Sequence, residues 1–468
     1  MGVFRKQSHK EFSTNQVVQV YRELQKSPYT SDEEAVQSPK KDAILSSESL
    51  QTTDSEFEDI SYPEGGAKAW LVVFGSFCAT GAVFGLINTS AVFESYLKEN
   101  QLRDYSHSQI GWIFSIYLFL VFSLGIFVGP IFDSYGPRLL VAAGSVVTVA
   151  SMMLLSLCTE YYQILLTYSV LGGIGGVLLY APAYGSIAHF FNVKRGFATG
   201  IATTAGGIGG IVLPLLLQYL LSDDGVGFGW SCRILAFIFL GLCSASNAFI
   251  RSRLGPPAKS ATLKSIWPDF SILQDRGFAL ATIGIFFMEW GLFAPLTYVV
   301  SYAKSHGNTS AESSVLLALL NAASVFGRFL PGLLADKVGR FNVIISTIAL
   351  CVGSILGLWL PAGDSKPILF AFCICFGFAS GSNLGLIPVC IGQFCDSRDY
   401  GRYVTTANTI ASFGTLSSIP MGGALLGAGG QAGWERLIGF SAASYSVACI
   451  CYTLARVSVT GWELRKKF

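Results

Sequence analysis

The sequence predicts an all-α membrane protein whose twelve transmembrane helices form two six-helix bundles. Three observations support this fold class: long apolar runs recur along most of the chain, charges are scarce, and one charged turn motif occurs twice at matched positions. Of the 468 residues, 51% are hydrophobic and 13% are charged, and the mean hydropathy is +0.52. A soluble globule of this size needs a more highly charged surface, so the chain belongs in a bilayer.

The apolar runs define the individual spans. Each membrane helix needs about 20 mostly apolar residues, so twelve of them use about half of the chain and leave short loops. The predicted spans are 69–93, 109–131, 139–158, 164–186, 197–221, 231–250, 278–301, 314–335, 341–361, 367–388, 404–426 and 435–456.

These spans divide the chain into five parts. A polar N-terminal tail without periodicity is expected to be disordered, and the longest internal loop, rich in Arg and Lys, separates two groups of six spans. The predicted parts are a cytosolic tail at 1–62, the N-terminal bundle at 63–250, a cytosolic linker at 251–277, the C-terminal bundle at 278–456 and a cytosolic tail at 457–468.

An Asp-x-x-Gly turn with a nearby arginine ends one span in each half of the chain. The glycine, aspartate and glycine of the motif follow one another at the same intervals in both copies, which indicates an internal duplication. Because both copies lie at span ends, near neighbouring helix ends and their partial charges, we predict that they gate the cytoplasmic face and do not touch substrate. The gating residues are Gly129, Asp133, Gly136 and Arg138 in the first copy, and Gly332, Asp336, Gly339 and Arg340 in the second.

Loop charge predicts the orientation in the membrane. One set of loops, including the linker, collects most of the Lys and Arg residues, and the positive-inside rule places these loops and both chain termini in the cytosol. The plasma membrane is the expected location. Asn308, in the triplet Asn308-Thr309-Ser310, then lies outside and is a candidate glycosylation acceptor.

Two charged residues stand out inside the predicted spans, Arg328 in the eighth and Glu289 near the middle of the seventh. Such a residue costs about 2.5–3.5 kcal/mol at the bilayer centre, so it normally faces protein or a water-filled cavity. Arg328 carries a permanent charge on a planar fork that suits a carboxylate, and it is the predicted substrate ligand. Glu289 is a candidate for proton coupling, because a poorly hydrated glutamate holds its proton more readily. The alternative is that the two residues pair with each other.

Four further polar residues lie within spans and could line the same cavity. Each could instead serve a contact between helices. They are Asn88, Tyr117, Asn321 and Asn383.

The sequence also argues against other classes of protein. The eleven cysteines lie almost all in apolar runs and the four histidines are scattered, so no metal site or cofactor is predicted. The net charge of +2 gives no reason to expect nucleic acid, and no nucleotide-binding motif accompanies the glycine clusters. A membrane-embedded enzyme lacks a convergent catalytic set. The other class of function considered is a nutrient sensor that has the fold of a transporter.

Three motifs resemble the major facilitator superfamily, and within it the fungal branch of the monocarboxylate porter family. Glu64-Gly65-Gly66 with Trp70 resembles the family's entry to the first helix. The stretch 191–209, beginning Phe-x-x-Lys-Arg, looks like its fifth-helix signature, and the stretch 324–328 matches the eighth-helix segment that ends in Arg328. In that family this arginine binds the substrate carboxylate. The resemblance implies two six-helix bundles, a central cavity and alternating access, with a small-molecule substrate.

The resemblance leaves the cargo and the coupling ion open. Animal members carry an aspartate and a lysine at the positions that look like Ser324 and Asn88 here, so proton–lactate symport is not carried over. The expected function is secondary active transport of a small organic solute that bears a carboxylate, with protons as the candidate coupling ion. Similar fungal proteins suggest two alternatives, which are export of a secondary metabolite and uptake of riboflavin.

Overall fold

The computed structural model describes residues 61–222, 224–254, 267–427 and 430–462. Nearly all of the predicted N-terminal tail, the middle of the linker and the end of the C-terminal tail therefore lie outside the described residues. Within the described ranges, twelve helical stretches are long and apolar enough to cross a membrane. The predicted fold class is confirmed, and most spans run a few residues beyond the predicted ends because the helices continue past their most apolar part.

Regular helix is interrupted in three of the first six spans. The first span breaks at Thr89, the second at Leu124, and the fourth starts with a short helix followed by a π-helix. The elements are α3 (Ala67–Asn88), α4 (Ser90–Glu99), α5 (His107–Ser123), α6 (Gly125–Tyr135), α7 (Arg138–Leu155), α8 (Tyr161–Ile164), η1 (Leu165–Leu171), α9 (Gly172–Phe190), α10 (Arg195–Leu220) and α11 (Gly227–Phe249).

The last six spans are more continuous, with one π-helix that ends the ninth span. A short 3₁₀-helix precedes them. The elements are η2 (Phe270–Gln274), α13 (Arg276–Ser305), α14 (Ser310–Val338), α15 (Arg340–Ser354), η3 (Ile355–Trp359), α16 (Lys366–Ile391), α17 (Tyr400–Leu426) and α18 (Gly430–Thr460).

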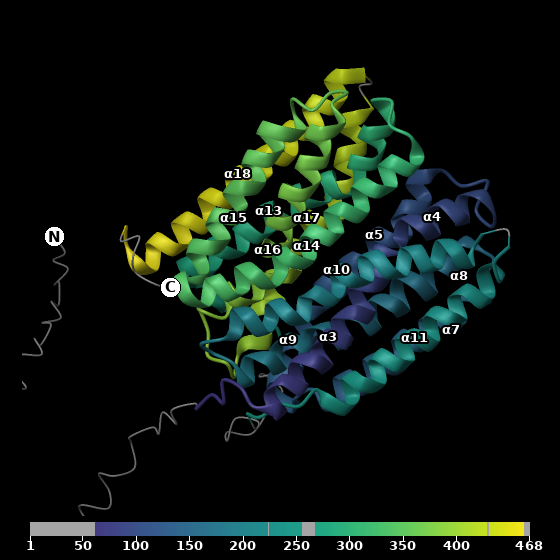
Figure 1. Ribbon diagram of the computed structural model, residues 1–468. Helices are drawn as coiled ribbons and strands as arrows, with labels where there is room; N and C mark the ends of the chain where they lie inside the picture. Colours follow the sequence, from purple (N-terminus) through teal and green to yellow (C-terminus); the bar gives the residue numbers. More distant parts are fainter. Residues whose placement is uncertain (1–60, 223, 255–266, 428–429, 463–468) are drawn as a thin grey trace, which may run out of the picture. The chain divides into compact units, whose positions relative to one another are not determined.

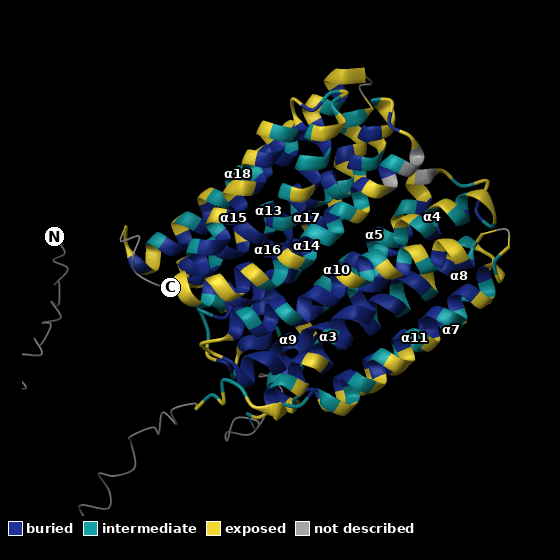
Figure 2. Ribbon diagram, in the orientation of Figure 1, coloured by how far each residue is buried: buried dark blue, intermediate teal, exposed yellow. Residues whose placement is uncertain are grey.

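The helices pack as two bundles that follow the order of the chain (Figure 1). In the N-terminal bundle α3 packs on α9, α10 and α11, and in the C-terminal bundle α13 packs on α17 and α18 while α14 packs on α16. Across the boundary α10 lies along α14, and α17 lies along α5 and α6. The buried residues follow these contacts, whereas exposed residues lie on the outward faces (Figure 2).

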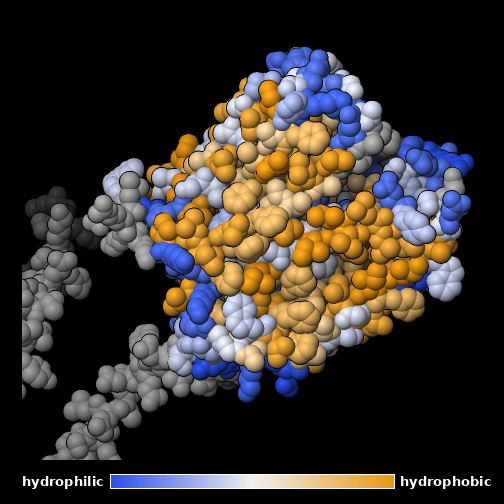
Figure 3. Space-filling view, in the orientation of Figure 1, coloured by the Kyte–Doolittle hydropathy of each residue, from blue (hydrophilic) through white to orange (hydrophobic). Residues whose placement is uncertain are grey.

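On the face seen in Figure 3, apolar side chains form a belt across both bundles, with polar residues gathered at its two sides. Leu139, Val146 and Leu215 are among the exposed large apolar residues, at 80%, 70% and 59% exposure. Such a surface is stable only against lipid. We call the end with the α6–α7 and α14–α15 turns the inner end, and the end with the α13–α14 loop the outer end. The names follow the prediction from the positive-inside rule that this end faces the cytosol.

Glycines allow α10 and α14 to approach each other closely. A Cβ atom added at Gly207 would lie 2.7 Å from Val325 Cγ2, and one added at Gly200 would lie 2.6 Å from the Arg328 carbonyl oxygen. Small residues of this kind let two membrane helices pack backbone to backbone. The glycines of α10 thus lie in one of the two extensive contacts between the bundles, the other being that of α17 with α5 and α6.

Candidate substrate site and inner gate

Arg328 reaches across the boundary between the bundles. Its Nη1 donates to the Thr203 carbonyl oxygen of α10 at 2.6 Å, and its Nε donates to Ser324 Oγ at 3.3 Å. Gly206 makes room for the guanidinium, because a Cβ atom there would lie 2.6 Å from Nη1. The Tyr184 hydroxyl interacts electrostatically with the same group. No carboxylate within the described ranges forms an ion pair with Arg328.

Two of the predicted asparagines lie along the same contact, nearer the outer end. Asn88 Nδ2 donates to the carbonyl oxygens of Phe84 at 2.7 Å and of Gly206 at 3.1 Å. Asn321 Nδ2 donates to the Gly210 carbonyl oxygen at 3.5 Å. Both side chains lie close to Gly210, since a Cβ atom there would lie 3.0 Å from Asn88 Cγ and 3.3 Å from Asn321 Oδ1. The structure thus brings Asn88 and Asn321 together beside α10, next to Arg328.

The other two predicted polar residues make contacts between helices within one bundle. The Tyr117 hydroxyl donates to the Val83 carbonyl oxygen at 3.2 Å, and Tyr117 is 2% exposed. Asn383 Oδ1 accepts from Thr347 Oγ1 at 2.8 Å, so its amide is directed at α15. In this structure both side chains contact neighbouring helices of their own bundle.

An aromatic group near Arg328 was missed from the sequence. Phe84, Phe122 and Tyr180 pack edge to face or tilted, with ring centroids 5.6–6.5 Å apart, and Tyr184 packs against Tyr180 at 5.1 Å. Asn408 of α17 donates from Nδ2 to the Tyr180 hydroxyl and so joins the two bundles. Asn408 could have been found, because an asparagine inside a span is the signal that identified Asn321. The aromatic residues are too common in spans to stand out.

Glu289 is buried in the C-terminal bundle and is separate from Arg328. It is 5% exposed, and its Oε2 atom has no hydrogen-bond partner among the described residues. It interacts electrostatically with the hydroxyls of Tyr180, Tyr445 and Tyr452. Because no ion pair joins it to Arg328 in the described chain, this structure does not show the pairing considered from the sequence.

Each of the duplicated aspartates caps a helix of the opposite bundle. Asp133 accepts from the backbone N–H groups of Gly401 at 2.9 Å and Arg402 at 2.8 Å, at the start of α17. Asp336 accepts from Gly196 at 2.9 Å and Phe197 at 2.8 Å, at the start of α10. A carboxylate at a helix N-terminus is stabilised by the free N–H groups and by the helix dipole. The sequence predicted contacts that close each half, but the structure shows contacts that close the two halves against each other.

The glycines of the motif set the spacing of this gate. A Cβ atom at Gly129 would lie 2.5 Å from the Gly401 carbonyl oxygen, and one at Gly332 would lie 2.4 Å from that of Gly196. Gly136 and Gly339 have positive φ angles of 78° and 113°, which favour glycine at the turns that follow. The four glycines therefore permit two close helix crossings and two tight turns.

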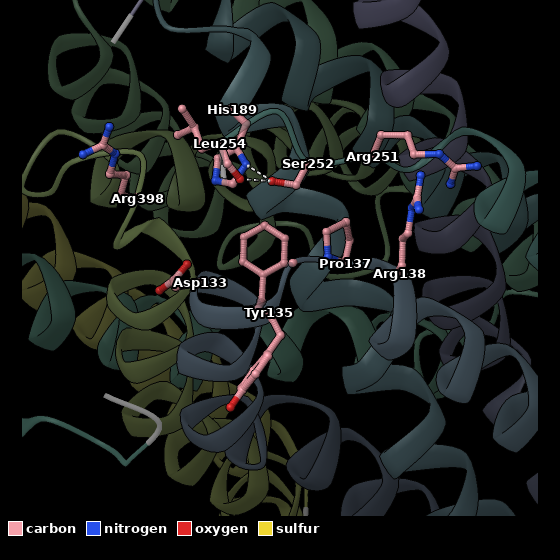
Figure 4. Close-up of a pocket in the computed structure, with 11 residues that line it drawn as sticks. Asp133, Tyr135, Pro137, Arg138, His189, Arg251, Ser252, Leu254 and Arg398 are labelled. Atoms are coloured by element: carbon pink, nitrogen blue, oxygen red, sulfur yellow. Dashed lines mark hydrogen bonds between the residues drawn. The ribbon is translucent and has the colours of Figure 1, made fainter. Parts of the chain in front are cut away.

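The two arginines of the motif behave differently. Arg340 forms an ion pair with Asp336 at 3.8 Å and donates from Nη2 to the Asn192 carbonyl oxygen. Arg138 lines a cavity together with Arg251 (Figure 4) and forms no ion pair with Asp133 among the described residues. The duplication is thus preserved for the aspartates and glycines but not for the arginines.

Ser397 collects further contacts between the bundles at the inner end. Arg195, which is 2% exposed, donates from Nη2 to Ser397 Oγ at 2.9 Å and from Nη1 to the Gly392 carbonyl oxygen at 3.1 Å. Tyr62 Oη lies 2.8 Å from Ser397 Oγ, and His189 Nε2 is hydrogen-bonded to the Ser397 carbonyl oxygen at 3.1 Å. With the aspartate caps, these contacts close the inner end in this structure.

Glu64, the acidic residue of the motif before the first membrane helix, binds the loop between α9 and α10. Its carboxylate accepts from the backbone N–H groups of Asn192 and Val193, both at 2.7 Å, and of Lys194 at 3.0 Å. The acidic residue before the first helix therefore orders the loop that leads into α10. The glycines that follow, Gly65 and Gly66, have φ angles of 154° and 85°.

The glycosylation candidate Asn308 is 9% exposed, and its Nδ2 donates to the Ala303 carbonyl oxygen at 3.0 Å. It lies in a short loop between α13 and α14, close to the membrane. We expect this side chain to carry no glycan. Treating the protein from a glycosylating host with an endoglycosidase should leave its electrophoretic mobility unchanged, as it should for an Asn308→Gln variant. A shift seen in the wild type and lost in the variant would contradict this expectation.

Two bundles of six spans, an arginine between them at mid-membrane and paired carboxylate caps at one end define a transporter that moves small molecules across a membrane. The sequence profile described as Major Facilitator Superfamily matches residues 69–419, and the chain belongs to this family. Its members are transporters and not enzymes.

Several fungal relatives are similar over most of the chain. An MFS-type transporter of Penicillium oxalicum is 39% identical over 86% of this chain and 94% of its own. The riboflavin transporter of Saccharomyces cerevisiae is 34% identical over 88% and 82%, and the fujikurins efflux protein of Gibberella fujikuroi is 34% identical over 87% and 86%. Among solved structures, a transporter of this superfamily in the outward conformation shares the fold, with a TM-score of 0.64 and 17% identity over 83% of this chain and 99% of that one.

Proposed function

We propose that the protein exports an acidic organic metabolite with an aromatic or otherwise apolar body, which binds between the bundles at mid-membrane. The proposal rests on Arg328. This residue is a permanent cation at the contact between the bundles, and it has no carboxylate partner in the described chain. A carboxylate or an acidic enol can accept two hydrogen bonds from the guanidinium group of Arg328. Arg328 and Asn321 serve as substrate ligands, with Asn88 beside them.

The aromatic group beside Arg328 supports the apolar part of the proposed cargo. Phe84 and Phe122 are both partly exposed, and they lie next to Tyr180 and Asn408 from opposite bundles. Aromatic faces stack well on planar ligands. Two relatives, the aspyridones efflux protein of Emericella nidulans and the fujikurins efflux protein of Gibberella fujikuroi, favour export.

Riboflavin uptake is the second candidate. A relative that is 34% identical over 88% of this chain carries that name, and a planar ring system fits the same aromatic group. The two candidates differ in charge, because riboflavin has no carboxylate and does not need Arg328. A nutrient sensor built on this fold would bind the same ligands without moving them.

Transport in sealed vesicles tests the proposal. Purified protein is reconstituted, a pH gradient is imposed, and the flux of aromatic acids, simple monocarboxylates and riboflavin is measured against protein-free vesicles. We expect aromatic acids to move fastest. Preferential riboflavin flux would favour the second candidate, and binding without any flux would favour a sensor.

We propose Glu289 as the proton-coupling residue, because it is buried without a cation or a full set of hydrogen bonds in the described chain. Glu289→Gln mimics the protonated side chain. We expect this variant to lose at least about 90% of the flux driven by a pH gradient while it retains substrate exchange across vesicles without a gradient. Glu99→Gln, at the exposed end of α4, is the matched control. Unchanged gradient-driven flux in Glu289→Gln would exclude the coupling role.

A further inference from the structure

A cavity at the inner end is lined by three arginines and lies away from the proposed substrate site. It has a volume of about 210 Å³, and Arg138, Arg251 and Arg398 line it together with His189 and Ser252 (Figure 4). A second cavity of about 210 Å³ shares Arg138 and Arg251 and extends between α7 and the end of α11. Neither cavity is used by the transport mechanism described above.

Two of the three arginines, Arg138 and Arg251, have no carboxylate partner among the described residues. Arg251 donates from Nη1 only to backbone carbonyl oxygens, those of Asn247 at 2.7 Å and Ile250 at 2.9 Å. Within the described ranges, neither Arg251 nor Arg138 forms an ion pair. Asp133 lines the first cavity, but its carboxylate accepts two hydrogen bonds from the start of α17. Two arginines that share two cavities without a carboxylate partner favour a bound anion.

The position at the membrane surface identifies the kind of anion. Arg138 is the first residue of α7, and the next residue, Leu139, is 80% exposed on the apolar belt. Tyr135, also a lining residue, is 60% exposed. A phosphate group held by the arginines would therefore sit where acyl chains can run along α7. Basic pockets between membrane helices on the cytoplasmic side are suited to anionic lipid headgroups.

We propose that Arg138 and Arg251 form a binding site for the phosphate group of an anionic phospholipid from the leaflet at the inner end. Arginine suits this role because its planar fork can donate two parallel hydrogen bonds to phosphate oxygens. Arg398 faces the same cavity from the loop before α17 and adds positive charge. A lipid bound here would contact α6, α7 and the segment after α11.

Native mass spectrometry of the full-length protein tests the proposal. Protein in detergent is titrated with phosphatidylinositol phosphate or with phosphatidylcholine, and the bound fraction is measured. We expect the anionic lipid to bind at least about tenfold more tightly than phosphatidylcholine, and the Arg138→Gln/Arg251→Gln variant to lose most of this preference. Lys194→Gln/Lys337→Gln is the matched control, because it removes two exposed positive charges from the same end outside the cavity.

Two further measurements separate the possible outcomes. Inorganic phosphate is added as a competitor, and the melting temperature of each variant is measured to show that it is folded. Displacement of the lipid only at millimolar phosphate supports a lipid site. Phosphate that binds as tightly as the lipid would replace the proposal with a soluble-anion site. Equal lipid preference in the cavity variant and in the control would overturn it, as would equal binding of both lipids to the wild type.

Discussion

Replacing Arg328 by glutamine should abolish transport of acidic cargo. The variant removes the positive charge that lies near Thr203 and Tyr184 and is proposed to bind the anion. A hydrogen bond to a charged group contributes about 1.5–3 kcal/mol, and 1.4 kcal/mol corresponds to a factor of ten. We expect at least about a tenfold loss of flux at low substrate concentration, measured as initial rates in vesicles.

Further variants at this position separate charge from geometry. Arg328→Lys keeps the charge but loses the planar fork, so its flux should lie between those of wild type and Arg328→Gln. Arg233→Gln is the matched control, because Arg233 also lies within a span but contacts Trp230 and Ser156 near the outer end. Wild-type flux of an acidic substrate in a folded Arg328→Gln variant would show that Arg328 is structural.

Removing both aspartate caps should open the inner end. In Asp133→Asn/Asp336→Asn each amide can still accept one hydrogen bond, but the charge at the start of α17 and of α10 is lost. A hydrogen bond to a charged group contributes about 1.5–3 kcal/mol. Asparagine removes the charge but keeps one hydrogen bond, so the loss at each cap does not exceed this value. We expect the population with an open inner end to rise about tenfold or more.

Distances between spin labels measure this change. Lys194 and Lys337 are exposed at the inner end, one on each side of the α10–α14 contact, and cysteines at these positions can carry the labels in a background without native cysteines. The double aspartate variant should add a longer distance to the distribution. Asp104→Asn/Asp364→Asn changes two exposed aspartates in loops far from the gate and should leave it unchanged. An unaltered distribution in the gate variant would argue against the capping role.

Hydropathy and spacing were enough to predict the fold. A membrane span is defined by about 20 consecutive apolar residues, so its existence can be read locally from the sequence. The same holds for the duplicated turn, because Asp133 and Asp336 recur at matched ends of matched spans. Arg328 stood out for a similar reason, since a charge inside a span is costly wherever the span packs.

The partners of these residues were decided by the tertiary structure. Asp133 binds an N–H group 268 positions further along the chain, and nothing near it in the sequence identifies that helix start. Likewise, Arg328 is hydrogen-bonded to Thr203 and not paired with Glu289. Arg138 lines a cavity with Arg251, whereas its counterpart Arg340 forms an ion pair with Asp336. Which face of a helix meets which neighbour depends on packing between segments distant in sequence, here set by the glycines of α10 and α14. The sequence alone therefore determined the spans and the unusual residues, whereas only the packing of the two bundles determined what those residues contact.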